Sequence, residues 1–278
     1  MNRPVLHGLY VTRPAQEAPA WVASLVEAGW PAMAFPLIDI GPPSDPVMLA
    51  ARDAIRQEAH RYDALMFVSG AAVAHFFEGL DRLPWRPATR FWAPGPATGR
   101  RLAEALASHG VSPDRVDMPA ADADNFDSEA LWPVVQPMVR PGTRVLLVRG
   151  CSRGADPASA GDIPGQGRSW LIERCREAGA VVEGCVAYER GVPHWTEERV
   201  RLARQGMRPG HAWLFSSSES IDHLARMPGA ADWHEACALA THPRIAERAS
   251  RIGFGSVVRL RPTLQDLLSA LESGWSRP

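Results

Sequence analysis

The chain has 278 residues, of which 46% are hydrophobic and 22% charged, so it can build packed cores as one large domain or two medium ones. Its formal net charge of −1 argues against a nucleic-acid-binding protein, which usually carries a strong basic excess. No apolar run approaches the ~20 residues that cross a bilayer, and the first residues lack the apolar core of a signal peptide. Four scattered cysteines without a Cys-x-x-Cys pair indicate free thiols and a cytoplasmic protein.

The basic residues exclude several kinds of chemistry, because all 30 of them are arginine. A chain without lysine cannot form a Schiff base with a carbonyl substrate or with pyridoxal phosphate. It also lacks the lysine of a phosphate-binding Walker loop, which weakens any interpretation as a nucleotide-dependent transferase. Each arginine instead offers a planar fork of donors that fits a carboxylate.

Strands and helices alternate along the first half of the chain. Apolar runs predict strands at 8–12, 32–40, 63–69, 90–93 and 115–118. Amphipathic spacing and capping residues predict helices at 14–29, 46–60, 71–80, 97–109 and 128–139. The proline-rich segment 41–46 between the second strand and the second helix is typical of a linker.

The second half continues the alternation after a long irregular tract. Strands are predicted at 144–149 and 181–188, a helix at 169–178, and further helix faces at 245–252 and 264–271. The tract 150–167 is long for an ordinary connection, so we expect it to be either disordered or a mobile lid. Residues 191–195 form a second candidate linker.

Two patterns of strands and helices each occur twice. The first pattern is strand, helix and strand, and it covers 9–40 and returns at 145–190. The second is a strand ending in serine, a helix, a strand, a polar turn and a helix, and it covers 63–110 and returns at 211–253. This duplication predicts two similar α/β halves that face each other, with a ligand between them.

Taken in order, short segments of the chain resemble the uroporphyrinogen-III synthase family. The matching pieces are Thr12-Arg13-Pro14, AFPLI (34–38), FVS (67–69), GPAT (95–98), DSEAL (127–131), VRG (148–150), GRSWL (167–171), AYER (187–190), and FSSS and THPRIAE near the end. The chain departs from the family where Val68 replaces a threonine, where the 151–166 tract is longer than expected, and where the turn at His242 replaces a glycine-and-threonine turn. In that turn, His242 or Arg244 would take over the role of the threonine hydroxyl.

The resemblance implies a fold and a division into domains. It implies two parallel-sheet α/β domains with helices on both faces, joined by a two-stranded connector, with the ligand in the cleft between them. Residues 1–38 and 189–278 would build one domain, and residues 39–188 the other. Such a connector would permit hinge motion.

The resemblance also implies the reaction. The substrate would be hydroxymethylbilane, a linear tetrapyrrole rich in carboxylates, which loses water and closes to uroporphyrinogen III with inversion of its last pyrrole ring. This is a lyase step of tetrapyrrole (heme) biosynthesis that needs no cofactor and depends mostly on positioning, with some acid catalysis. We expect a monomer that meets hydroxymethylbilane synthase transiently and binds neither nucleic acid nor membrane. The alternative function is a non-catalytic two-domain protein that binds a tetrapyrrole-like small molecule.

Tyr188 is the expected catalytic residue, since it matches the tyrosine of the family's second crossing strand and a phenol can protonate a departing hydroxyl. The alternative role is a half-buried tyrosine that fills space. The expected substrate-binding residues lie near the carboxyl ends of strands, the edge where ligands bind in open α/β sheets. They are Thr12, Arg13, Ser69, Thr98, Arg149, Arg168, Ser217, Ser218, His242 and Arg244.

Most of these residues also have a simpler structural explanation. The serines and Thr98 could serve only as helix caps, and the arginines could be solvated surface residues. Arg168 is favoured among the arginines because it follows the expected lid, and a lone histidine before a proline is more often structural. The nine histidines show no spacing typical of a metal site, so no metal is expected.

Overall fold

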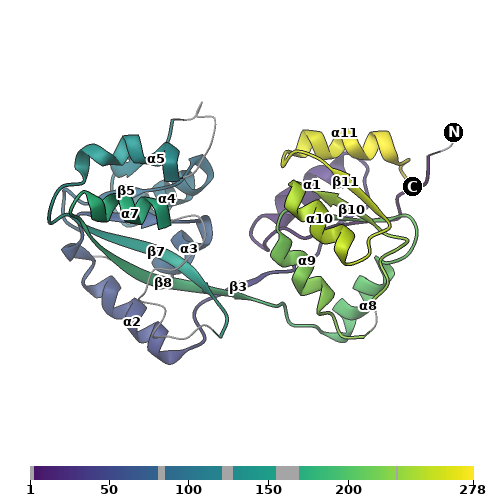
Figure 1. The fold of residues 1–278 in the computed structure, drawn as a ribbon, viewed down its shortest axis with the longest axis horizontal. Coiled ribbons are helices and arrows are strands. Elements are labelled where there is room, and N and C mark those ends of the chain that lie inside the picture. Colours follow the sequence, from purple (N-terminus) through teal and green to yellow (C-terminus); the bar gives the residue numbers. More distant parts are fainter. Residues whose placement is uncertain (1–2, 81–84, 121–127, 155–168, 230) are drawn as a thin grey trace. The chain divides into compact units, whose positions relative to one another are not determined.

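The structure is a computed structural model that describes residues 3–80, 85–120, 128–154, 169–229 and 231–278. The chain divides into two compact units, one made of Met1–Asp39 and Gly191–Pro278 and the other of Ile40–Arg190 (Figure 1). The first unit is therefore built from the two ends of the chain, and the second from its middle.

The first unit contains a sheet of five strands in the order β11-β10-β9-β1-β2. The strands are β1 (Gly8–Val11), β2 (Ala32–Ala34), β9 (His211–Phe215), β10 (Cys237–Ala240) and β11 (Ser256–Arg259). All neighbouring strands pair in parallel. The direction in which the chain adds strands reverses between β1 and β9, which makes this pair the topological switch point of the sheet.

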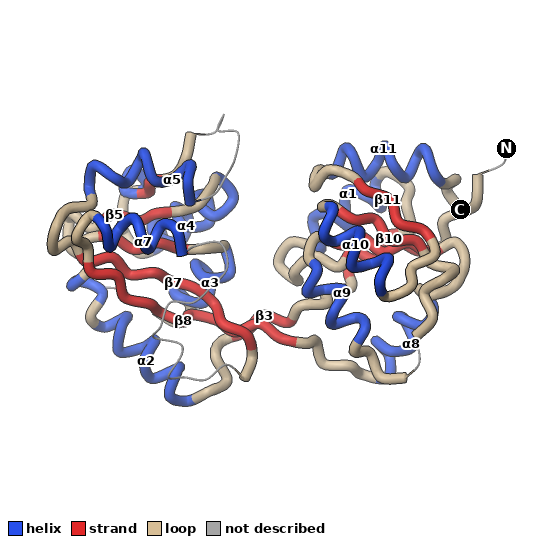
Figure 2. The backbone as a smooth tube through the Cα atoms, viewed as in Figure 1, coloured by secondary structure: helices blue, strands red, loops and turns tan. Residues whose placement is uncertain are grey.

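Both faces of this sheet are covered by helices, because successive side chains of a strand point to opposite faces and both sets are apolar (Figure 2). On one face, Tyr10 and Trp213 pack with α8 (Glu197–Gln205), α9 (Ser218–Ala225) and α10 (Pro243–Arg251). On the other face, Leu9 and Leu214 pack with α1 (Ala18–Glu27) and α11 (Leu264–Gly274). All of these strand residues are fully buried.

The second unit contains a sheet of six strands in the order β3-β8-β7-β4-β5-β6. The strands are β3 (Asp39–Gly41), β4 (Ala64–Phe67), β5 (Arg90–Trp92), β6 (Val116–Asp117), β7 (Arg144–Ser152) and β8 (Val181–Gly191). From β8 to β6 all pairs are parallel. Here the direction of strand addition reverses between β4 and β7, which is the switch point of this sheet.

Helices again cover both faces. Leu65 and Phe67 of β4 pack with α3 (Gly70–Phe77) and α4 (Pro96–Ser108), where Ile55 of α2 (Pro46–Gln57) joins them. On the opposite face, Met66 packs with α5 (Ser128–Val135) and α7 (Ser169–Glu177). Short 3-10 helices lie at Ala59–Arg61, Pro113–Arg115 and Gln136–Met138. The expected fold class, parallel α/β sheets with helices on both faces, is confirmed.

The duplicated sequence patterns correspond to a duplicated topology. Reading outward from the switch point, β9, β10 and β11 of the first sheet occupy the places of β4, β5 and β6 in the second. In the same way β1 and β2 occupy the places of β7 and β8. Each sheet thus contains one copy of each pattern.

Three predicted strands differ clearly from the observed ones. The run 32–40 is not a single strand, because β2 ends at Ala34 and β3 begins at Asp39 in the other sheet. Pro36 lies between them and has no N–H group to continue the hydrogen-bond ladder. Strands β7 and β8 run past their predicted ends at 149 and 188, because they go on pairing with each other as far as Ser152 and Arg190. Most of the expected lid lies outside the described residues.

Candidate functional site

In the second unit, the carboxyl edge at the switch point brings Ser69 and Tyr188 together. Ser69 lies two residues after the end of β4, and Tyr188 lies on β8 with β7 between the two strands. The Tyr188 hydroxyl lies 3.3 Å from Ser69 Oγ. The phenol therefore reaches across β7 to the end of the strand beyond it.

A glycine and a β-bulge on β7 make this reach possible. The pairing of β7 with β8 shifts between Arg149 and Gly150, so that Arg149 faces Val186 but Gly150 faces Tyr188. A Cβ atom at Gly150 would lie only 2.4 Å from the Tyr188 ring atoms Cε2 and Cζ. Because glycine has no side chain, the ring can lie directly over this strand.

The surroundings of Tyr188 combine packing with polar contacts. The residue is only 6% exposed and belongs to the core on the α3 side of the sheet. The His75 ring stacks with its ring at a centroid distance of 6.1 Å, and His75 Nδ1 lies 3.0 Å from Glu78 Oε2. The Tyr188 ring thus fills space in the core, which agrees with the alternative role, while its hydroxyl has Ser69 as a polar partner.

Ser69 is the N-cap of α3, as its simpler explanation predicted, and it also contacts the tyrosine. Its Oγ accepts a hydrogen bond of 3.2 Å from the backbone N–H of Ala72. A serine hydroxyl has one proton to donate and two lone pairs to accept. Since the cap uses a lone pair, the Ser69 proton is free to be donated to the Tyr188 oxygen, and the Tyr188 proton can then point elsewhere.

Three further residues lie near this edge. Arg149 precedes the bulge, and burial lowers the pKa of its guanidinium, while the nearby Cys151 partly offsets that effect. Thr98 is half-buried in the first turn of α4. Arg101 lies one turn further along α4 and was missed by the sequence reasoning, although its i+3 spacing from Thr98 places both on one helix face.

In the first unit, the hydroxyl of Thr12 forms a hydrogen bond within the protein. Thr12 follows β1, is 1% exposed, and donates from Oγ1 to the carbonyl of Leu214 on β9 at 2.7 Å. Thr241, which follows β10, donates in the same way to the carbonyl of Phe215 at 3.3 Å. Both threonines therefore tie neighbouring strands together at the carboxyl edge.

Arg13 is held by its neighbours on the following helix. Its Nη1 lies 3.0 Å from Glu17 Oε2, and its guanidinium lies 3.9 Å from the centroid of the Trp21 ring. Its side chain is 14% exposed. The glutamate already neutralises part of the charge that a substrate carboxylate would meet.

The remaining predicted residues of the first unit lie at helix starts. Ser217 is the N-cap of α9 and accepts from the backbone N–H of Glu219 at 3.2 Å, and half-buried Ser218 is the first residue of that helix. His242 caps α10, because its Nδ1 accepts from the backbone N–H of Arg244 at 3.2 Å. His242 and Arg244 are both exposed. Arg168 lies outside the described residues.

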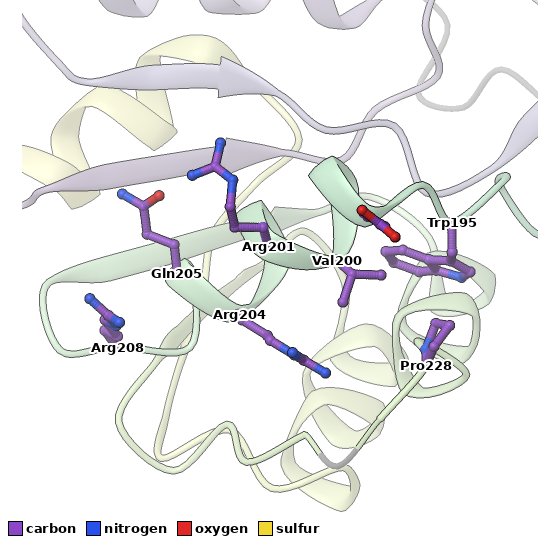
Figure 3. A pocket seen from close by; sticks show the side chains of 8 residues that line it. Trp195, Val200, Arg201, Arg204, Gln205, Arg208 and Pro228 are labelled. Atoms are coloured by element: carbon purple, nitrogen blue, oxygen red, sulfur yellow. The ribbon is translucent and has the colours of Figure 1, made fainter.

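No metal centre is present among the described residues, where no three histidine, cysteine or acidic side chains gather closely enough to hold an ion. A groove of about 610 Å³ runs along α8, lined by Trp195, Glu197, Val200, Arg201, Arg204, Gln205, Arg208 and Pro228 (Figure 3). It contains none of the residues predicted from the sequence.

These observations define a class: a doubly wound parallel α/β protein of two related units, with hydroxyl and arginine side chains at the carboxyl edges of its sheets. Residues 19–269 match the family described as Uroporphyrinogen-III synthase HemD. The chain belongs to the uroporphyrinogen-III synthase family.

A solved structure agrees with this fold. Uroporphyrinogen-III synthetase from Helicobacter pylori 26695 is similar with a TM-score of 0.56 and 14% identity, over 98% of this chain and 99% of that chain. A mutant uroporphyrinogen III synthase from the extremely thermophilic bacterium Thermus thermophilus has a TM-score of 0.49 and 19% identity, over 96% of this chain and 98% of that chain.

Family membership confirms the function expected from the sequence. The chain is a cyclising lyase of tetrapyrrole biosynthesis, and the family's substrate is hydroxymethylbilane. The non-catalytic binding protein is not favoured. Within the described part of the chain, no helix combines the length and the hydropathy needed to span a membrane.

Proposed function

We propose that the carboxyl edge of the second sheet is where this chain forms uroporphyrinogen III from hydroxymethylbilane, with Tyr188 as the general acid. The first chemical step breaks the bond between the terminal hydroxymethyl carbon and its oxygen. The electrons of the adjacent pyrrole nitrogen assist the departure and leave a cationic azafulvenium that keeps its N–H proton and whose charge balances the phenolate. The leaving hydroxyl group takes a proton and departs as water, and this proton is the one we assign to Tyr188.

The contact between the hydroxyl groups of Ser69 and Tyr188 is the observation that supports this role. Ser69 Oγ accepts from the N–H of Ala72 and lies 3.3 Å from the Tyr188 oxygen, so its proton can be donated to that oxygen. This donation leaves the Tyr188 proton for the substrate and stabilises the negative charge that develops on the phenol oxygen. Burial of the ring, at 6% exposure, keeps competing water away from it.

Tyr188→Phe tests the proposal, since it removes only the hydroxyl group. We expect kcat to fall by roughly 10²- to 10⁴-fold, the usual contribution of a general acid, while the thermal midpoint changes little. Tyr62→Phe is the matched control, because the Tyr62 hydroxyl donates to Glu183 at 2.8 Å and has no role in the proposed chemistry. Equal kcat values in wild type and Tyr188→Phe would remove Tyr188 from the mechanism.

The predicted binding residues are part of the same proposal. Ser69, Thr98 and Arg149 at the edge of the second sheet, and Thr12, Arg13, Ser217, Ser218, His242 and Arg244 in the first unit, would hold acetate and propionate groups of the substrate. Arg168 remains a proposed residue of this set. Backbone N–H groups at the starts of α3, α9 and α10 support an anionic ligand at these edges.

The domain division 1–38 plus 189–278 and 39–188 is also proposed, and the compact units, which meet along the chain at Asp39 and Arg190, support it. We propose a monomer of the cytoplasm that encounters hydroxymethylbilane synthase transiently and uses no cofactor. All four cysteines are free, which supports a reducing compartment.

A further inference from the structure

Arg101 packs closely against Gly70, the first residue of α3. The side chain fits there because residue 70 is a glycine and has no Cβ atom. A Cβ atom at Gly70 would lie 2.8 Å from Arg101 Cδ, 3.0 Å from Nη1 and 3.2 Å from Nε. The guanidinium therefore rests on the backbone of Gly70, the residue that follows Ser69. Ser69 forms the hydroxyl pair with Tyr188, so Arg101 lies against the residue that follows this pair in the chain.

The charge of Arg101 is not balanced within the described residues. Elsewhere in the second unit, Arg90 pairs with Asp117, Arg144 with Glu183 and Arg56 with Asp53. Over the described ranges, no carboxylate lies within salt-bridge distance of Arg101, although its side chain is half-buried.

The position of this cation is electrostatically unfavourable in the absence of an anion. The first turn of a helix carries a partial positive charge, so a cation placed there is repelled. The glycine at position 70 nevertheless lets the guanidinium come close. An anionic group bound beside Arg101 would be attracted both by the guanidinium and by the positive end of α3.

We propose that Arg101 binds a carboxylate group of the substrate and holds it beside Ser69 and Tyr188. The inference rests on the proposed function, because it assigns to Arg101 one of the acid groups of hydroxymethylbilane. The guanidinium offers a planar set of donors to a carboxylate, and Gly70 leaves room for it at the start of α3, next to Ser69 in the chain. Arg101 is thus a binding and specificity-determining residue.

Arg101→Gln removes the charge and keeps a polar side chain of similar reach. We expect KM for hydroxymethylbilane to rise roughly tenfold, with kcat within about threefold and the thermal midpoint unchanged. Arg100→Gln is the matched control, because Arg100 is the preceding residue of α4 and is exposed. If Arg101→Gln and Arg100→Gln have the same KM, the proposal is wrong.

Binding of uroporphyrin I separates this inference from the proposed function. This stable probe carries the same acetate and propionate groups and can be titrated by its absorption without any turnover. We expect its affinity to fall in Arg101→Gln and to be unchanged in Arg100→Gln, even if the wild-type chain formed no type III product. Equal affinities of the two variants would overturn the inference while leaving the proposed function standing.

Gly70→Ala gives an independent test that leaves every charge in place. The new methyl group must displace the Arg101 side chain, which is flexible and can move at little cost to stability. Because alanine favours helix formation, we expect the thermal midpoint to stay the same or to rise, while KM rises several-fold. An unchanged KM in Gly70→Ala would show that the place of the guanidinium does not matter.

Discussion

At the scale of single residues, Gly150 and Tyr188 depend on each other. The phenol ring occupies the space in which a Gly150 side chain would lie, 2.4 Å from the Cβ position. A side chain at position 150 would displace the ring, because a packed interior has no room for an added methyl group.

Gly150→Ala should therefore destabilise the protein by about 1–3 kcal/mol and lower kcat, since the ring has to leave its place over β7. Gly41→Ala is the control, because a Cβ atom at Gly41 would meet nothing within 4 Å. Urea unfolding of Gly150→Ala, alone and together with Tyr188→Ala, measures the coupling between the two positions. If Gly150→Ala costs the same stability with and without the tyrosine ring, the contact described here is not the cause.

At the scale of elements, helix caps account for several residues that the sequence singled out. His242 accepts from the N–H of Arg244 through Nδ1 and thereby starts α10. His242→Ala should cost about 0.5–2 kcal/mol, and His242→Asn, whose side-chain oxygen can cap, should restore most of it. Thermal unfolding gives the stabilities, and KM shows whether His242 also holds substrate. If KM rises equally in His242→Asn and His242→Ala while only the alanine variant loses stability, the binding role is separate from capping.

The segment between β3 and α2 is fastened to β8 by a buried carboxylate. Glu189 is 3% exposed and accepts from Ser44 N–H at 3.0 Å, from Ser44 Oγ at 2.9 Å and from Arg153 Nε at 2.7 Å. Burial alone would raise the pKa of Glu189, but the hydrogen bonds from Ser44 and Arg153 outweigh it, and the pKa is lowered. The ionised form is thus stabilised in the folded state.

This shift predicts how stability depends on pH. A carboxyl group whose pKa is lower in the folded than in the unfolded chain stabilises the fold above its unfolded pKa of about 4.3. That contribution is lost as the pH falls through the folded pKa. Glu189→Gln should be less stable than wild type at pH 7, and the difference should shrink towards pH 3, as followed by urea unfolding. A difference that stays constant over this range would contradict the account.

Most elements could be predicted from the sequence because their signals are local. The spacing of apolar residues marked α1, and the capping position at Ser44 or Asp45 before Pro46 marked α2. The cap at Thr263 marked α11, where the Thr263 hydroxyl accepts from the N–H of Asp266 at 3.1 Å. Helix α8 was not predicted, since its sequence is mostly charged. Its own signal was the cap at Thr196, which accepts from the N–H of Arg199 at 3.2 Å.

The candidate site was only partly predictable, because its contacts join residues far apart in the chain. Tyr188 and Ser69 were both named from the sequence, but their pairing depends on the strand order β8-β7-β4 and on the bulge at Gly150. Arg101 escaped notice because its role depends on how α4 packs against Gly70. No spacing along the chain encodes such a contact.

At the scale of the whole molecule, the repeated sequence patterns correspond to a repeated topology, but the side chains at the carboxyl edges of the two sheets differ. In both sheets the strand at the switch point is followed by a serine that caps a helix, Ser69 in one and Ser217 in the other. The second sheet adds a tyrosine over a glycine at its carboxyl edge, from the strands β7 and β8, which pair with each other as far as Ser152 and Arg190. The repeat explains the common scaffold, and the chemistry is assigned to the place where the copies differ.

The central claim is that this chain directs ring closure with inversion of the last pyrrole. The most direct test is to incubate the purified wild-type protein with hydroxymethylbilane and to separate the type I and type III isomers of the product. The account predicts predominantly uroporphyrinogen III. Formation of only the type I isomer, which arises spontaneously without the enzyme, would contradict it.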